Sequence, residues 1–346
     1  MDQARIASLL CLIVAFAPLA GCMQMVERPE VYGYAPLALK RTPVADGRLT
    51  ARFLGTTTLV LSDGRTTIMT DGFFSRPSFW KLLAFPVRPH EGRIRAGLDA
   101  AGVTTASAIF VAHSHHDHAM DTPYVAQLTG AAIVGSDSTR NIALGVSFPD
   151  DRIKRIADRT VCRFGDFTVT AFETPHSSPT LFPGRIDRPL GRSARVWNYR
   201  EGGNFTFHVA HPLGSVLIVP SLGVRSGWVV PKTADVVFLG MGGAIRKTER
   251  LKRFWQQFVR GPGTAVVYPI HWDDFFAGPA SGSDPHVPKR LRKKLSILNE
   301  LAGRPDVVKV PPYASEIVLA DGRRDVASGA GEAGERGCVP VVPVAP

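Results

Sequence analysis

The sequence predicts an α/β sandwich in a single domain, and three observations carry that prediction. The chain has 346 residues, of which 45% are hydrophobic and 21% charged, so it can bury a large core. Segments with strand composition alternate with segments of helical periodicity. Mixed strand pairs with interspersed helices are typical of α/β proteins. The same composition excludes a disordered chain, a collagen-like fibre and a protein with many membrane spans.

The predicted elements each rest on a local pattern. Residues 49–61 are rich in β-branched and apolar types, which favour a strand, and Ser62-Asp63-Gly64 is a turn into a second strand at 66–70. Residues 91–101 place apolar side chains on one helical face, and the apolar residues 108–112 predict a buried strand. Further elements are expected in this order: strand and helix alternating over 121–145, a β-rich stretch over 155–220, a helix at 247–259, a strand at 265–270 and a helix at 288–301.

The first 21 residues have the pattern of a secretory signal. Arg5 lies in a short polar region, an apolar run extends over residues 6–20, and the segment ends Leu19-Ala20-Gly21-Cys22. The apolar run is short for a transmembrane helix. Its last four residues resemble a bacterial lipobox, which implies cleavage before Cys22 and acylation of the Cys22 thiol. An ordinary cleaved signal or an uncleaved anchor is the alternative.

A lipid anchor would place the protein in the bacterial cell envelope. Met23 follows the cysteine where an Asp would resemble an inner-membrane retention signal, so we expect the outer membrane, facing the periplasm. Residues 22–48 contain three prolines that interrupt any helix and are expected to be a tether. Residues 321–346, composed largely of Ala, Gly, Val and Pro, are expected to be a disordered tail. The folded domain is then expected to cover 49–320.

Two of the four cysteines are available for a disulfide. Cys11 is lost with the signal and Cys22 is expected to carry the lipid, which leaves Cys162 and Cys338. An oxidising periplasm could join them. Because Cys338 lies in the expected tail, the sequence leaves this pairing open.

The charge balance indicates an anionic partner. Lys and Arg number 41 against 30 Asp and Glu, which gives a formal net charge of +11. Cleavage after residue 21 would remove one acid and one base, so the surplus belongs to the mature chain. Nucleic acid, a lipid surface or a small acidic substrate would each suit it. The basic run Lys289-Arg-Leu-Arg-Lys-Lys294 lacks interleaved aromatic residues, so we expect no nucleic acid.

A cluster of histidines directly follows the predicted strand at 108–112. It reads His113-Ser114-His115-His116-Asp117-His118, in a chain with 10 histidines in all. His113 and His115 are two apart in extended chain, so they point the same way and can bind one cation. The next two potential ligands, Asp117 and His118, lie where the chain enters a helix. His and carboxylate ligands suit Zn²⁺, and Fe or Mn would accept the same set.

This HxHxDH pattern after a strand resembles that of the metallo-β-lactamase superfamily, and three further segments extend the resemblance. Ile68-Met-Thr-Asp71-Gly72 resembles the second-strand motif, whose Asp supports a ligand from behind. Glu173-Thr-Pro-His176 resembles the third ligand segment, and Tyr268-Pro-Ile-His271-Trp272 resembles the strand with the last His. In family order the segments cover residues 49–320. The resemblance implies a four-layer αβ/βα sandwich.

The resemblance also implies two metal positions, with His113, His115 and His176 on one and Asp117, His118 and His271 on the other. In the family a bridging Asp usually follows a later strand, but here Val216-Leu-Ile-Val-Pro-Ser221-Leu-Gly223 places Ser221 at that point. A neutral hydroxyl is a poor bridge, so Ser221 is at most a weak ligand, and the sequence leaves one or two metals open. With one metal, Asp117 is free to act as a general base on water.

We expect three other histidines to lie outside the two metal positions. His116 occupies the variable position of the motif and is expected to point away from the metals. His208 and His211 lie on or beside the strand pair that leads to Ser221, and we expect them to be structural or to support a ligand.

Two loops are candidates for shaping the substrate. The insert between Phe73 and His90 is apolar, and it would line an acyl pocket, contact a bilayer or pack on the domain's own core. The loop over 185–200 contains five arginines, of which Arg185, Arg188 and Arg192 are candidate anion ligands. A solvated basic loop is the alternative.

The expected function is therefore a metal-dependent hydrolase. A metal-bound hydroxide would attack a small anionic or lipid ester, such as a lactone, a phosphodiester or a phospholipid. One alternative is a β-lactamase, and another is a metal-binding surface lipoprotein without catalysis. Within the superfamily, the segment around His271 is most similar to the lactonase and phospholipase D-like branches. The sequence does not indicate an oligomeric state.

Overall fold

The computed structural model describes most of the domain. The described residues are 26–27, 47–221, 223–226, 230, 232–242, 248–261, 263–277, 287–288, 290–304, 306–311, 313–321 and 337–339. The expected signal, Cys22 and all but a few residues of the expected tether lie outside them. Among the described residues, no helix has the length and apolar character needed to span a membrane.

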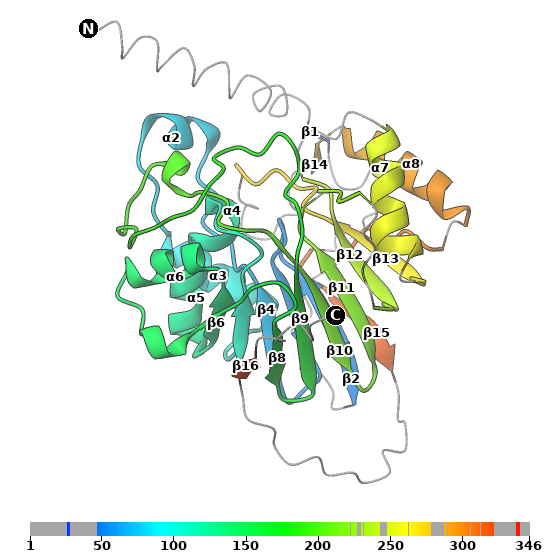
Figure 1. Ribbon diagram of the computed structural model, residues 1–346, viewed down its shortest axis with the longest axis horizontal. Helices are drawn as coiled ribbons and strands as arrows, with labels where there is room; N and C mark the ends of the chain where they lie inside the picture. The colour runs from blue at the N-terminus through cyan, green and yellow to red at the C-terminus, as the bar shows by residue number, and fades with distance from the viewer. Residues whose placement is uncertain are drawn as a thin grey trace, which may run out of the picture.

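Two seven-stranded sheets form the centre of the molecule (Figure 1). The first has the order β15 (Glu316–Asp321), β2 (Arg48–Phe53), β3 (Leu59–Ser62), β4 (Thr67–Thr70), β5 (Ala108–Phe110), β6 (Ala132–Gly135) and β7 (Ile153–Arg155). The second has the order β13 (Val266–Ile270), β12 (Val236–Gly240), β11 (Gly214–Val219), β10 (Phe205–His211), β9 (Phe167–Glu173), β8 (Val161–Phe164) and β16 (Gly337–Val339). A small two-stranded sheet joins β1 (Val26–Glu27) to β14 (Val287–Pro288).

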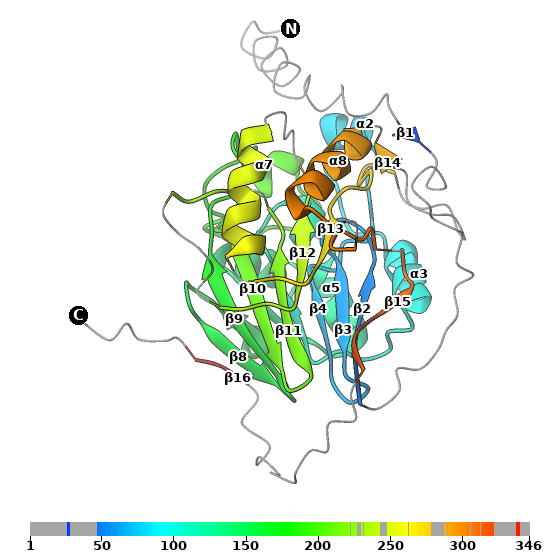
Figure 2. The same cartoon turned by 90° about the vertical axis from the view of Figure 1, so that its right-hand side faces the viewer.

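Helices cover the outer face of each sheet. On the first sheet lie α3 (Glu91–Ala101), α5 (Thr122–Thr129) and α6 (Asp137–Leu144). On the second lie α7 (Thr248–Trp255), its π-helical continuation η4 (Gln256–Arg260) and α8 (Arg290–Ala302). Figures 1 and 2 show the resulting order helix, sheet, sheet, helix. The predicted four-layer sandwich in one domain is confirmed.

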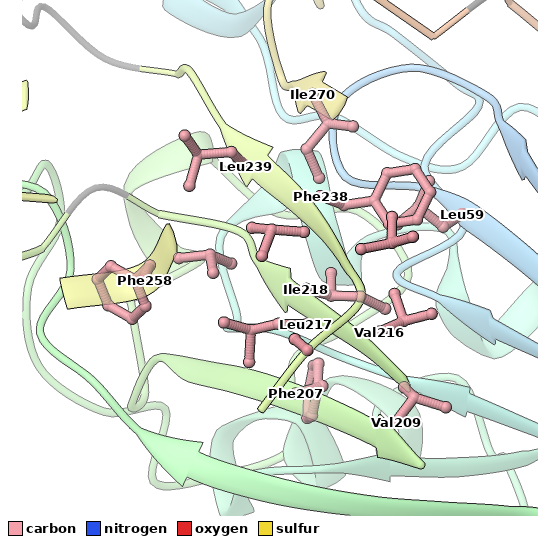
Figure 3. Close-up of a cluster of buried hydrophobic side chains, with 14 of the residues drawn as sticks. Leu59, Phe207, Val209, Val216, Leu217, Ile218, Phe238, Leu239, Phe258 and Ile270 are labelled. Carbon is pink, nitrogen blue, oxygen red and sulfur yellow. The ribbon is translucent and has the colours of Figure 1, made fainter. Parts of the chain in front are cut away.

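Strand alternation divides the apolar side chains between two cores. On and after β5, Ala108 and Phe110 face the second sheet, whereas Ile109 and Val111 face α3 and α5. Phe110 meets Phe207 of the second sheet with ring centroids 5.6 Å apart. Figure 3 shows the same alternation in the second sheet, where Phe238 lies towards Leu59 of the first sheet, while Leu217 and Leu239 lie towards Phe258 of η4, all within one continuous core.

Parallel pairing brings the candidate ligand segments to one edge. β4, β5, β6 and β7 run parallel, and so do β11, β12 and β13. β9 shares the direction of β11, because each is antiparallel to β10. The carboxyl ends of these strands meet across the two sheets, since Phe205 N donates to Ala112 O at 2.9 Å and His271 N donates to Thr56 O at 2.6 Å.

Two local predictions are corrected. Residues 49–61 do not form one strand, because Gly55 and Thr56 have φ of 88° and 51° and turn the chain between β2 and β3. Part of the expected disordered tail is also ordered, since residues 337–339 form β16 against β8. There a disulfide joins Cys162 and Cys338, so these two cysteines do pair.

Three helix predictions agree closely with the structure. The helix expected over 91–101 is α3, and its apolar face, Ile94, Leu98 and Ala101, is buried. It ends at Gly102, whose φ of 66° is the left-handed conformation that glycine favours at this position. The helix expected at 247–259 is α7 with η4, and the one expected at 288–301 is α8.

Candidate metal centre

The candidate ligands come from loops at the shared edge of the two sheets. After β5 the chain passes through His113 and His115 in extended form and then enters the short helix α4 (His116–Ala119). His176 follows β9 and His271 follows β13. Residues distant in sequence thus converge because the strands before them end at one edge.

One group consists of His113, His115 and His176. Each offers a ring nitrogen, and the three atoms lie within 4.8 Å of one another. The ring centroids of His113 and His115 are 4.7 Å apart, and that of His176 lies 4.7 Å from the first and 5.0 Å from the second. Three convergent imidazoles are a common zinc-binding set.

The second group consists of Asp117, His118 and His271, again with one ligand atom each within 4.8 Å of the others. Asp117 Oδ2 lies 3.6 Å from His118 Nε2 and 3.5 Å from His271 Nε2. The groups adjoin, because the rings of His113 and His118 have centroids 3.8 Å apart. The six residues that the resemblance implies are therefore brought together as two neighbouring triads.

Asp71 fixes the orientation of His118 from behind. Asp71 Oδ2 lies 2.9 Å from His118 Nδ1 and also accepts a hydrogen bond from the Thr57 hydroxyl. Its other oxygen accepts from Ala112 N at 2.8 Å. Because an ionised carboxylate only accepts, His118 Nδ1 is the donor and Nε2 is left facing Asp117.

Ser221 contacts the loop of His176. Its hydroxyl oxygen accepts a hydrogen bond from Ser177 N at 3.0 Å. His176 Nδ1 donates to Ser177 O at 3.0 Å, which leaves Nε2 as the free ring nitrogen. Ser221 therefore supports the neighbour of a candidate ligand.

The buried nitrogens of the site fit a divalent cation. Both ring nitrogens of His113 and Nε2 of His115, all in the first triad, are buried without a hydrogen-bond partner among the described residues. Unpaired buried polar atoms cost free energy, so a native protein usually satisfies them. A cation bound between the ligand atoms of a triad would give such nitrogens a partner. Imidazoles with one carboxylate are ligands that divalent transition metals accept.

Burial also favours the neutral imidazoles that bind metals. It lowers the pKa of His115 to about 3 and of His176 to about 4, and neighbouring histidines add to the effect. The pKa of His113 is lowered well below its usual value for the same reasons. These three rings are therefore unprotonated at neutral pH without any cation present.

The second triad has the opposite electrostatics. Burial opposes ionisation of Asp117, but His118 and a hydrogen bond with His271 outweigh it, and the Asp117 pKa lies well below its usual range. Burial lowers the pKa of His118, but the Asp117 and Asp71 carboxylates outweigh it and raise that pKa. Asp117 is consequently a carboxylate at any physiological pH.

Sequence reasoning missed a buried ion pair that supports the loop of His271. Arg76 Nη2 lies 2.6 Å from Asp273 Oδ2, and both side chains are fully buried. The other oxygen of Asp273 accepts from Thr56 N at 2.8 Å, and Thr56 O accepts from His271 N. Gly55 makes room for the pair, since a Cβ there would lie 2.6 Å from Asp273 Oδ2. In the sequence, the isolated glycine of Gly55-Thr-Thr was a signal of this close approach, because a glycine inside a strand pattern often marks one.

His116 and His208 lie outside both triads. His116 is buried against Phe73 and Phe275, and its Nδ1 is 3.6 Å from Asp117 Oδ1. His208 Nε2 donates to Thr233 O at 2.7 Å.

His211 joins a third group with Asp63 and Asp166. In this group His211 Nδ1 accepts from Leu213 N at 3.2 Å, so Nε2 is the donor to Asp63 at 3.3 Å. Both nitrogens of His211 are thereby used within the fold.

The three candidate arginines of the loop at 185–200 are exposed. Among the described residues, no hydrogen bond or ion pair links Arg185, Arg188 or Arg192 to either triad. The loop runs beside the insert at residues 73–90, because Val87 and Ala194 form an antiparallel bridge.

Solved structures of other proteins share the fold of this chain. No protein-family model matches the sequence. A UPF0173 protein of Pyrococcus abyssi is 28% identical over 182 residues, which are 53% of this chain and 74% of that protein.

Two solved structures are similar across most of the chain. The metallo-beta-lactamase fold protein YhfI from Bacillus subtilis matches 79% of this chain and 99% of its own, with a TM-score of 0.50 and 12% identity. CmlA, a diiron beta-hydroxylase from Streptomyces venezuelae, matches 79% of this chain and 55% of its own, with a TM-score of 0.50 and 13% identity. Identities this low show a shared fold and do not show a shared activity.

Proposed function

We propose that this chain, which has the metallo-β-lactamase fold, is a metal-dependent hydrolase of anionic esters. The observation that carries the proposal is the pair of adjoining, buried triads, His113, His115 and His176 beside Asp117, His118 and His271. A divalent cation, when bound, activates water and polarises the oxygen of an ester or phosphoryl group. Hydrolysis is the simplest chemistry that this arrangement supports.

The residues of the chain have distinct roles in this proposal. The three neutral histidines of the first triad hold a cation without having to release protons. Asp117 supplies the negative charge of the second triad, and Asp71 keeps His118 in the orientation that presents Nε2. If only the first triad binds a metal, Asp117 is the group placed to accept a proton from water.

Ser221 favours an anionic substrate. A serine where the family usually has an aspartate leaves the centre with one negative charge fewer, which strengthens attraction of a phosphate or carboxylate group. Arg185, Arg188 and Arg192 are exposed and would contribute to the positive field around the site. A phosphodiester, a phospholipid or a lactone that carries an anionic group fits these requirements.

Zinc is the proposed metal, in one or two equivalents. Imidazole with one carboxylate suits Zn²⁺, and Mn²⁺ or Fe²⁺ would accept the same ligands. Iron is the more specific alternative, because CmlA shares the fold and is described as a diiron enzyme. Metal analysis of the pure protein distinguishes them.

The location of the enzyme is also part of the proposal. The pattern ending at Cys22 supports a lipid-anchored protein in the bacterial envelope, on the periplasmic side of the outer membrane. The disulfide between Cys162 and Cys338 is compatible with that oxidising compartment. Labelling with palmitate, expected for the natural chain and not for Cys22→Ala, tests the anchor.

Activity is tested on the metal-loaded protein with phosphodiester, lactone and thioester substrates. We expect turnover with Zn²⁺ or Mn²⁺, and its loss together with metal in His115→Ala. His90→Asn is the matched control, because it removes an exposed imidazole at the start of α3 and keeps a residue that caps helices.

Two outcomes would replace the proposal. Turnover of nitrocefin in preference to the esters, lost in His113→Ala, would identify a β-lactamase. Stoichiometric metal with no turnover of any substrate would identify a metal-binding protein without catalysis.

A further inference from the structure

Large apolar side chains are exposed at both ends of the short helix α2 (Phe79–Ala84), within the insert at residues 73–90. Trp80 is 67% exposed and Phe85 is 62% exposed. The same helix buries Phe79 and Leu82 on its other face. Helix packing therefore explains Phe79 and Leu82, but it does not explain the outward position of Trp80 and Phe85.

Exposed basic residues lie close to these two aromatic residues in the sequence, and Arg195 joins them through a hydrogen bond. Lys81 and Arg88 are exposed, and the sequence contains no acid between residues 78 and 90. Arg195 lies next to the end of α2, because its Nη1 donates to Ala84 O at 2.7 Å. Arg192 is exposed two residues before the bridge partner of Val87. The α2 surface thus combines exposed aromatic rings with a local excess of positive charge.

We propose that this α2 surface, made of Trp80, Phe85, Lys81 and Arg88 with Arg195 beside them, docks on an anionic lipid bilayer. Tryptophan prefers the interface between water and hydrocarbon, and nearby cations bind anionic headgroups. A second copy of the chain fits less well, because two such surfaces would bring like charges together. The proposal does not require a metal in the triads.

Aromatic contacts connect the α2 surface to the candidate metal centre. Trp80 meets Phe79 at 5.4 Å between ring centroids, and Phe79 meets Phe276 at 5.6 Å. Phe276 meets Phe275 at 4.3 Å, and Phe275 meets His271 at 5.6 Å. These contacts place the α2 surface and the candidate metal centre on one continuous aromatic cluster, so where the proposed hydrolase function holds, docking would bring the centre close to the bilayer.

The test uses the full chain as Cys22→Ala, with chelator present, and vesicles that contain phosphatidylglycerol and phosphatidylcholine with brominated acyl chains. We expect quenching of tryptophan fluorescence on vesicle addition, and we expect Trp80→Phe to remove most of it. Any contribution of the apolar run at residues 6–20 is the same in every variant. Only insertion near Trp80 makes the quenching depend on that residue.

Vesicle sedimentation provides the second measurement. Replacing both Trp80 and Phe85 with Asp should lower partition into anionic vesicles by about tenfold or more, since it removes two apolar anchors. Val318→Asp is the matched control, because Val318 is an exposed apolar residue on β15, far along the chain from α2. Circular dichroism of each variant verifies that the fold is retained.

Three results would overturn the docking surface. The first is quenching that is unchanged in Trp80→Phe, and the second is vesicle binding without any quenching. The third is light scattering that shows a dimer which the double substitution dissociates, because the surface would then be a contact between copies. Since the chelator removes metals, failure of the hydrolase proposal leaves this experiment interpretable.

Discussion

His118 is held on both sides by carboxylates, and only one of them belongs to a triad. Asp71 accepts from Nδ1 at 2.9 Å, while Asp117 lies 3.6 Å from Nε2. Groups that orient a metal-binding histidine influence affinity nearly as strongly as the ligands do. We therefore expect the Asp71 carboxylate to contribute to metal affinity through His118.

Asp71→Asn should weaken zinc binding by about tenfold to a hundredfold. A neutral amide attracts the Nδ1 proton of His118 less strongly than a carboxylate does. Competition titration against a chromophoric chelator measures the affinity. Asp63→Asn is the control, since Asp63 forms an equivalent pair with His211 outside the triads. Equal losses in both variants would point to a general effect on stability.

Ser221→Asp should strengthen binding of the second equivalent of Zn²⁺. A carboxylate there can still accept from Ser177 N, and it restores a negative charge beside the triads. We expect the second dissociation constant, measured by calorimetry, to fall by about tenfold or more. The neutral Ser221→Asn should give no gain, and a gain with Asn would disprove the electrostatic explanation.

Acid should destabilise the metal-free protein well above the pH at which carboxylates titrate. The folded-state pKa values of His115 and His176 are about 3 and about 4, below the ordinary 6.5. The unfolded chain therefore binds protons first, and stability present above pH 6.5 is lost as pH falls towards 4. His176 alone accounts for about 3 kcal/mol of this loss.

Urea unfolding between pH 7 and pH 4, with chelator, measures this pH dependence. His176→Asn should show a flatter profile, because asparagine does not titrate. A profile as steep as that of the parent chain would exclude His176 as a source.

At the scale of the element, the turn between β2 and β3 determines where His271 lies. The backbone of Thr56 contacts both His271 and Asp273, and Arg76 closes the contact from the insert. Breaking a buried pair by removing one partner leaves an uncompensated charge.

Arg76→Met should lower the free energy of unfolding by about 3 to 5 kcal/mol and weaken metal binding at the second triad. Chemical denaturation and metal titration measure the two effects. Arg140→Met, which breaks the exposed pair with Asp150, should leave both almost unchanged. Comparable destabilisation in the two variants would contradict the role given to burial.

Sequence pattern predicted the elements whose residues interact locally. The helix at 91–101 follows from its apolar face, and the histidine cluster follows from short spacing after a strand. The break at Gly55 had a local signal, an isolated glycine in a strand pattern, but the Arg76 and Asp273 pair that this glycine accommodates comes from distant segments. The strand at residues 337–339 was missed because its partner β8 lies far away in sequence.

At the scale of the whole molecule, the disulfide closes a long loop. Cys162 and Cys338 are 176 residues apart, and the loop contains His176 and His271. In the chain-entropy account a loop of this length restricts the unfolded chain by about 5 kcal/mol.

Cys338→Ser should therefore lower the free energy of unfolding by about 2 to 5 kcal/mol. Urea unfolding compares it with the parent chain, with and without reductant. The reduced parent should match the variant, and the variant should ignore reductant. A parent chain indifferent to reductant would show that the bond contributes nothing to stability.

Each triad takes two residues from the first sheet and one from the second. His113 and His115 meet His176, and Asp117 and His118 meet His271. A cation that binds only when the two sheets are docked is a ligand of the native state, so its free concentration sets how much it adds to the free energy of unfolding. At a hundred times its dissociation constant such a ligand adds about 2.7 kcal/mol to stability. Metal supply in the compartment would then govern the protein's lifetime as well as its chemistry.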